Sequence, residues 1–277
     1  MIHKDAILYW SEISPFADNV QVEQDLLLTG MLCKIYSHPV LSEKIAFRGG
    51  TCLQKLFMPN VFRYSEDLDF VQIQKEPIGD TIHTLRDVLS NIFEEDPAWA
   101  MRRDGCRLYY FFQAEGRESK QKIKIEINTR EQFSIEGYQK KELSFTSPWI
   151  SGEAQVTTFS LEEILATKLR ALYQRKKGRD LFDLWKSKEL KPGWEKVVHI
   201  FMKYMEKNKH PIHRDEMISN LHTKLSDKRF LSDIGPLLVE GAQYEVGKAA
   251  HFVEQKILSF VPESRVKQKK RKHRLKQ

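Results

Sequence analysis

The sequence predicts an α/β fold of the α+β kind, in which a lobe with strands and helices precedes a helical lobe. Apolar and polar residues alternate in short segments of the first lobe, as in half-buried strands. The helical period of 3.6 residues then dominates as far as the C-terminal tail. Turn-forming residues lie between the two patterns, in TSPWISG at residues 146–152. We therefore expect domains at residues 1–150 and 151–262, and a tail at residues 263–277.

Composition excludes several classes of protein. Of the 277 residues 41% are hydrophobic and 30% are charged. No apolar run approaches the roughly 18 residues of a membrane-spanning helix, and the N-terminus lacks the pattern of a secretory signal. Cys33, Cys52 and Cys106 are odd in number and lack metal-ligand spacing, which argues against a disulfide scaffold and a zinc module. We expect a cytoplasmic protein without a membrane partner.

The net charge of +7 is concentrated at the C-terminus. Residues 265–277 (RVKQKKRKHRLKQ) hold 8 of the 45 Lys and Arg residues and no acid, which leaves 37 basic against 38 acidic residues elsewhere. A block of like charge without an apolar pattern cannot form a core and is expected to be disordered. It is either a solvated tail or a segment that binds RNA phosphates.

The elements of the first lobe follow from residue patterns in chain order. Residues 22–36 carry apolar side chains at helical spacing and predict an amphipathic helix. A short strand at residues 44–47 precedes a glycine turn and a helix at residues 52–57. Alternation after Arg63 predicts a strand through residues 67–71. The other expected elements are a helix at residues 80–94 and strands at residues 107–113, 121–128 and 155–159.

Three carboxylates on two of these strands are candidate metal ligands. Asp67 and Asp69 are two residues apart on one strand and therefore point to the same face. Glu126 falls on the polar face of a later strand whose other face carries isoleucines. Carboxylates this close repel unless a cation neutralises them, and hard oxygen ligands suit Mg²⁺. Taken alone, an Asp-x-Asp pair is more often a solvated strand edge, so the context decides.

A glycine turn supplies that context. Gly49 and Gly50 separate a strand from a helix. Glycine there lets the backbone approach a phosphate, and the helix N-terminus offers free N–H groups. Thr51 can cap the helix or bond a phosphate oxygen. A Gly-Gly pair by itself is usually only a turn, but the acids that follow it in the sequence favour a phosphate-binding role.

Together, FRGGTCLQKLF and RYSEDLDFV resemble the signature of the DNA polymerase β-like nucleotidyltransferases, and more narrowly that of the AbiEii/AbiGii-type toxin nucleotidyltransferases. The resemblance covers about residues 20–187. It implies a polymerase β-like lobe with a mixed sheet, Asp67, Asp69 and Glu126 as catalytic ligands of Mg²⁺ or Mn²⁺, and Gly49, Gly50, Thr51 and Ser65 as nucleotide-binding residues. Two details depart from the family pattern. Glu126 stands where Asp is commoner, and 15 residues separate Thr51 from Asp67.

A lysine and an aspartate of the helical lobe are further candidates. Lys168 falls within the apolar arc of the helix that begins after Ser160. It must snorkel, pair with a carboxylate or meet another anion, because a buried unpaired charge is costly. Asp180 follows Gly178 and is either a helix cap or a site residue. The resemblance of ILATKLRAL and RDLFDLW to family segments implies that Lys168 binds a nucleotide phosphate and that Asp180, in preference to Asp183, is catalytic.

The resemblance also implies a function. It indicates a metal-dependent transferase that moves a nucleoside monophosphate from an NTP, bound between the two lobes, to an RNA acceptor, for which tRNA is the candidate. The protein would be the toxin of a toxin–antitoxin or abortive-infection system, with its antitoxin expressed from a neighbouring gene. Two alternatives remain open, an NTP-binding regulator and an RNA-binding protein that works through its basic tail. The intact acids Asp67, Asp69 and Glu126 argue against the regulator.

Overall fold

The computed structural model describes residues 2–93, 95–207 and 210–263, and the chain divides into two compact units. The first unit comprises Met1–Ser160 with Leu237–Ala242, and the second comprises Leu161–Pro236 with Gln243–Gln277. Of the tail expected at residues 263–277, all but Glu263 lies outside the described residues. No helix in the described part of the chain is long and apolar enough to cross a membrane.

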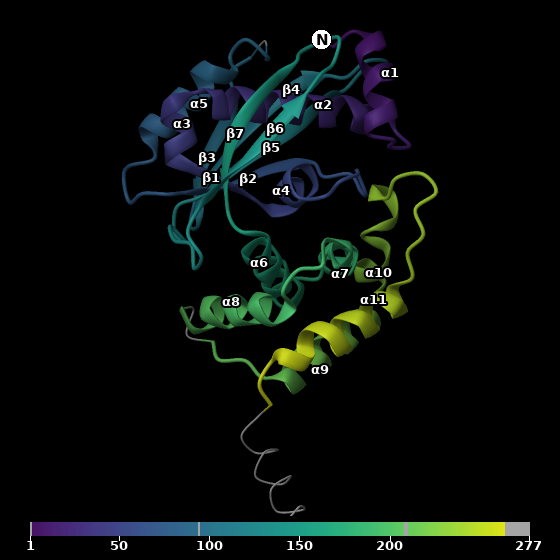
Figure 1. Ribbon diagram of the computed structural model, residues 1–277. Coiled ribbons are helices and arrows are strands. Elements are labelled where there is room, and N and C mark those ends of the chain that lie inside the picture. The colour runs from purple at the N-terminus through teal and green to yellow at the C-terminus, as the bar shows by residue number, and fades with distance from the viewer. Residues whose placement is uncertain (1, 94, 208–209, 264–277) are drawn as a thin grey trace, which may run out of the picture. The chain divides into compact units, whose positions relative to one another are not determined.

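A seven-stranded mixed sheet forms the centre of the first unit (Figure 1). Its strand order is β3-β4-β5-β2-β1-β7-β6, in which β2 pairs with β5 and β1 with β7 in parallel, and the other pairs are antiparallel. The strands are β1 Ile45–Arg48, β2 Asp67–Gln72, β3 Ala98–Arg102, β4 Gly105–Gln113, β5 Lys120–Asn128, β6 Gln139–Phe145 and β7 Gly152–Thr158. The α/β fold with a mixed sheet is thereby confirmed, and a strand lies at each of the five places where the sequence predicts one.

Helix α2 (Asn19–Ser37) covers one face of this sheet. The ring of Tyr36 on α2 lies 6.2 Å from the ring of Phe70 on β2, so α2 packs on the face that carries Leu68 and Phe70. Because side chains alternate along a strand, Asp67 and Asp69 point to the opposite face. The other helices of this unit are α1 Lys4–Ile13, α3 Pro39–Lys44, α4 Gly49–Leu56 and α5 Gly79–Leu89.

The first unit also differs from the sequence-based expectation. The helix expected at residues 80–94 ends at Leu89, where the hydroxyl of Ser90 donates to the carbonyl of Asp87 at 2.8 Å and competes with further helical hydrogen bonds. The sequence pattern predicts neither α1, β3 nor β6. Strand β3 gives no alternation signal because its segment AWAMR is apolar at four consecutive positions, and Trp99 and Met101 remain 52% and 51% exposed.

The second unit is helical, as the sequence predicts for the region after residue 160. Helix α6 packs against α7 and α8, with Leu165, Leu169 and Phe201 fully buried. The α-helices of the described residues are α6 Leu161–Gln174, α7 Gly178–Lys186, α8 Trp194–Lys207, α9 Arg214–Leu225, α10 Lys228–Ser232 and α11 Val246–Phe252. Short 3₁₀ or π turns lie at Ser187–Leu190, Gly235–Leu237, Val253–Ile257 and Leu258–Phe260.

Candidate active site

Strand pairing brings the three predicted carboxylates onto one face of the first unit. Strands β2 and β5 run parallel, with Asp69 opposite Glu126 and Asp67 opposite Lys124. These side chains share the face opposite to that of Leu68, which is fully buried between the two aspartates. All three acids therefore lie on the same face of the sheet, on the neighbouring strands β2 and β5.

Lys124 lies between two of these acids. Its Nζ is 3.0 Å from Asp67 Oδ2 and 3.1 Å from Glu126 Oε2. Arg107 on β4 donates two further hydrogen bonds to Glu126, at 3.0 and 3.2 Å. Neither cation is among the site residues that the sequence predicts. Lys124 could have been found from its place two residues before Glu126 on the same strand face, whereas the partner of Arg107 depends on sheet pairing.

The electrostatic environments of these acids differ. Burial raises the pKa of Asp67 to about 6, and the attraction of Lys124 offsets only part of that effect. Burial also raises the pKa of Glu126, but hydrogen bonds from Arg107 and Lys124 outweigh it and leave this pKa below its ordinary value. Burial opposes the charge of Lys124 too, yet the attraction of Asp67 and the neighbouring acids raises its pKa overall. Nearby cations therefore neutralise the negative charge of Asp67 only in part, whereas they neutralise that of Glu126 well.

Asp69 lies against the glycine turn and is the least engaged of the three acids. Within the described residues its carboxylate accepts no hydrogen bond and forms no ion pair. Gly49 has a φ of 88°, and a Cβ there would lie 2.5 Å from Asp69 Oδ2, so only glycine fits this position. Helix α4 begins at Gly49 without a side-chain cap, which leaves its first N–H groups available to an anion.

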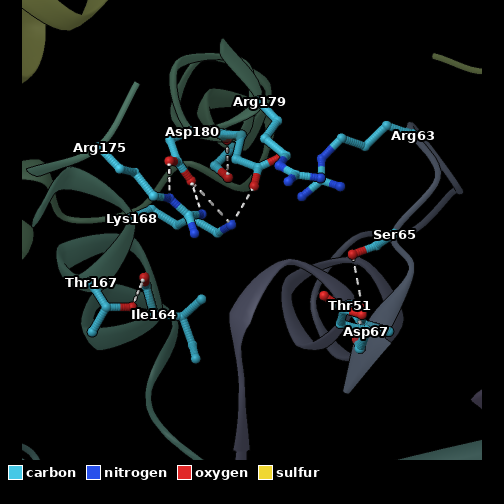
Figure 2. A network of polar contacts seen from close by, with 12 residues as sticks. Thr51, Arg63, Ser65, Asp67, Ile164, Thr167, Lys168, Arg175, Arg179 and Asp180 are labelled. Atoms are coloured by element: carbon cyan, nitrogen blue, oxygen red, sulfur yellow. Dashed lines mark hydrogen bonds and ion pairs between the residues drawn. The ribbon is translucent and has the colours of Figure 1, made fainter. Parts of the chain in front are cut away.

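The other predicted nucleotide-binding residues have different environments. Thr51 Oγ1 donates to the carbonyl of Asp67 at 2.6 Å and lies 2.8 Å from Ser65 Oγ (Figure 2). Thr51 is only 2% exposed, so its side chain attaches α4 to β2, whereas Ser65 is partly exposed. The buried guanidinium of Arg63 lies beside Gly50, where it would contact an added Cβ. Arg63 therefore adds positive charge near the N-terminus of α4.

The donor chemistry of this face suits a hard divalent cation. Asp67 and Asp69 supply carboxylate oxygens, one short of positive charge and the other without a partner among the described residues. The face is not a preformed cage, since no group of three His, Cys, Asp or Glu side chains in the described part of the chain is arranged to hold a metal ion. Glu126 is instead engaged by Arg107 and Lys124.

The second unit brings the two remaining candidates together. Lys168 Nζ lies 2.7 Å from Asp183 Oδ2 and 3.6 Å from Asp180 Oδ1, and both aspartates are fully buried. Asp180 also accepts two hydrogen bonds from Arg175, at 2.7 and 2.8 Å (Figure 2). Of the environments that the helical pattern allows for Lys168, the structure shows pairing with carboxylates. The shorter contact is to Asp183, although the resemblance to family segments favours Asp180 as the catalytic residue.

The family model described as "Nucleotidyl transferase AbiEii toxin, Type IV TA system" matches residues 31–250. This chain belongs to the AbiEii family. The match confirms the resemblance and includes every predicted site residue. The chain is therefore a nucleotidyltransferase toxin of the type IV toxin–antitoxin class, with an NTP as substrate and an antitoxin as partner, from a family that generally uses divalent metals.

Solved structures support the fold. JHP933 from Helicobacter pylori is 16% identical, with a TM-score of 0.54, and the alignment covers 94% of this chain and 98% of that one. MenT4, a nucleotidyltransferase toxin from Mycobacterium tuberculosis, is 13% identical, with a TM-score of 0.56 and coverage of 93% and 99%. No curated protein sequence matches the chain.

Proposed function

We propose that this AbiEii protein transfers a nucleoside monophosphate from an NTP to a hydroxyl group of an RNA acceptor in the cytoplasm. Transfer RNA is the candidate acceptor, and an antitoxin from a neighbouring gene is the expected inhibitor. The observation that supports the proposal best is the register of β2 and β5. It puts Asp67, Asp69 and Glu126 on one sheet face, with Asp69 beside the uncapped N-terminus of α4.

The reaction exchanges one phosphorus–oxygen bond for another. The acceptor hydroxyl oxygen forms a bond to the α-phosphorus, and the bond from that phosphorus to the oxygen bridging to the β-phosphate breaks, so pyrophosphate leaves. The hydroxyl proton passes to a site carboxylate, for which Glu126 is the candidate. The N–H groups at Gly49 and Gly50, with the Ser65 hydroxyl, would bind the β- and γ-phosphates.

Mg²⁺ or Mn²⁺ would be held by Asp67 and Asp69. The third candidate ligand is Glu126, whose carboxylate would give up its contact with Lys124. When bound, the cation stabilises the negative charge of the phosphoryl group in transfer. In the second unit Lys168 would neutralise nucleotide phosphate charge, while Asp180 and Asp183 orient its ammonium group.

Labelled transfer tests this function directly. Purified protein is incubated with each α-labelled NTP, Mg²⁺ and either total RNA or RNA depleted of tRNA. We expect label in RNA, loss of the signal on depletion, and at least about a hundredfold lower rate for Asp67→Asn and Asp69→Asn, since metal-based stabilisation commonly contributes several kcal/mol. Glu142→Gln on β6, which removes an exposed carboxylate, is the matched control and should retain the wild-type rate.

Three results would contradict the proposal. NTP binding without label in any RNA would favour the regulator. Near-wild-type transfer by both aspartate variants at saturating Mg²⁺ would exclude the metal site. RNA binding that is lost with the tail but does not require Asp67 would favour an RNA-binding protein without transfer activity.

A further inference from the structure

The sheet face that carries the three acids continues onto β4. Strand β4 pairs with β5 so that Arg107 lies opposite Glu126, Tyr109 opposite Lys124 and Phe111 opposite Lys122. Directly opposed residues of antiparallel strands share a face, so two aromatic side chains follow the acids along this surface. Phe111 is 38% exposed and Tyr109 is partly exposed. Tyr110, between them on the strand, points to the other face and is buried.

Lys122 supplies the positive charge of this surface. Its Nζ lies over the Tyr109 ring, 5.3 Å from the centroid. No carboxylate among the described residues pairs with it, although its strand neighbours Lys120 and Lys124 pair with Glu95 and with the site acids. An ammonium group whose described contact is a partly exposed ring is weakly fixed and can turn to an anion, which attracts it more strongly.

The rings of Tyr109 and Phe111, beside a lysine without a carboxylate partner among the described residues, match the chemistry of single-stranded nucleic acid. Sheet-based RNA-binding proteins stack two or three bases on aromatic residues of an open sheet face, while basic side chains bind the phosphates. An extended peptide needs a free strand edge for main-chain pairing. Strand β4 lies between β3 and β5, and β5 lies between β4 and β2, so neither offers one. This favours RNA over a peptide as the occupant.

The surface also has a suitable position relative to the acids. Lys122 and Glu126 are four residues apart on β5, which is about 13 Å at 3.3 Å per residue. The intervening side chain on this face is Lys124, which pairs with Asp67 and Glu126. A single strand that runs along β4 with its bases on Phe111 and Tyr109 would therefore reach the acids.

We propose that Tyr109, Phe111 and Lys122, here called the β4–β5 platform, bind the single-stranded end of the RNA acceptor. The proposal rests on the proposed function, because it assigns the acceptor of that same reaction to a surface. The two rings stack on successive bases and Lys122 binds a phosphate. Recognition by stacking is tolerant of sequence, so acceptors should be selected for an unpaired end. A blunt duplex of the same sequence should bind more weakly.

Binding of RNA tests the platform without using the transfer reaction. The anisotropy of a labelled single-stranded oligonucleotide is measured with full-length wild type and with Tyr109→Leu, Phe111→Leu and Lys122→Gln. Leucine keeps apolar bulk but cannot stack, so each aromatic variant should raise Kd by about 5- to 150-fold, the equivalent of about 1–3 kcal/mol per stacked base. Lys122→Gln should flatten the log–log salt dependence by about 0.7.

The matched control is Trp99→Leu. Trp99 is 52% exposed on β3 and pairs with Leu108, so it presents a comparable aromatic ring on the other face of the sheet. This variant should bind RNA like wild type. Melting temperatures identify any aromatic variant that has lost the fold. Because Lys122 is exposed, Lys122→Gln should fold, and it tests the platform even if an aromatic variant does not fold.

The outcomes separate the platform from the proposed function. Unchanged Kd and KM for RNA in the folded platform variants, with transfer still lost in Asp67→Asn, would overturn the platform alone. Platform variants that bind RNA normally but escape the antitoxin would also overturn it, in favour of a protein interface. Absence of transfer to any RNA by wild type would refute the proposed function, whereas weakened RNA binding by the variants would still support the platform.

Discussion

Replacing Lys168 by methionine separates the structural role of this lysine from its proposed role at a phosphate. Methionine keeps much of the side-chain length but removes the charge that lies 2.7 Å from Asp183 Oδ2 and 3.6 Å from Asp180 Oδ1. Asp180 keeps its two hydrogen bonds from Arg175. Asp183, fully buried, loses its close contact with the ammonium group.

The expected cost is about 3–5 kcal/mol in the free energy of unfolding, the range for removing one partner of a buried ion pair. From the apolar arc of the helix alone, methionine would be expected to be tolerated. The two buried carboxylates reverse that expectation. Stability loss by itself therefore cannot exclude a role of Lys168 in the reaction, and a compensated variant is needed.

Lys168→Met combined with Asp183→Asn supplies that compensation, because it removes the buried negative charge as well. Urea unfolding of wild type, both single variants and the double variant gives the coupling energy of the pair. We expect the double variant to recover at least about half of the loss. If Lys168 acts on the nucleotide, transfer should remain absent at saturating NTP even in the folded double variant.

Two results would refute this reasoning. Wild-type stability of Lys168→Met would mean that the ammonium group does not compensate buried charge. Recovery of transfer in the stable double variant would show that the reaction needs Lys168 only to neutralise Asp183. In either case the measured fraction of folded protein is used to correct the transfer rates, so the two effects stay distinguishable.

Three further predictions concern other parts of the chain. Gly49→Ala should lower the free energy of unfolding by about 1–3 kcal/mol in urea, because a Cβ at φ 88° is strained and meets Asp69. Gly79→Ala, where nothing lies within 4 Å of an added Cβ, should change it by less than about 0.5 kcal/mol. Burial lowers the pKa of Lys224 to about 8 from 10.5. The unfolded chain therefore binds more protons between those values, and wild type should gain about 3 kcal/mol relative to Lys224→Met as the pH rises from 8 to 10.5; a constant difference would contradict this. Deleting residues 265–277 should weaken RNA binding and reduce its salt slope by at most about 5.6, at roughly 0.7 per phosphate for eight basic residues, while NTP binding stays unchanged; identical slopes would exclude a role in RNA binding.

Local periodicity accounts for most of what could be predicted about the fold. Strands β2 and β5 were predictable because each buries one face, and α2 because its apolar residues recur at helical spacing. Strand β3 was not predictable, since Trp99 and Met101 stay exposed and no alternation marks it. Helix α5 stops earlier than its pattern suggests because the Ser90 side chain competes for a carbonyl at its end.

For the candidate site too, the sequence predicted what local periodicity decides and not what depends on long-range contacts. That Asp67 and Asp69 share a face follows from a strand period of two, and that Lys168 lies on the apolar arc of its helix follows from the helical period, so the sequence by itself determined both. Which residue lies opposite each of them depends on contacts between segments far apart in the chain. A slip of one residue between β2 and β5 would turn Glu126 to the buried face. Only the tertiary structure could therefore decide that Glu126 lies opposite Asp69, that Lys124 lies between two acids, and that Lys168 is nearer to Asp183 than to Asp180.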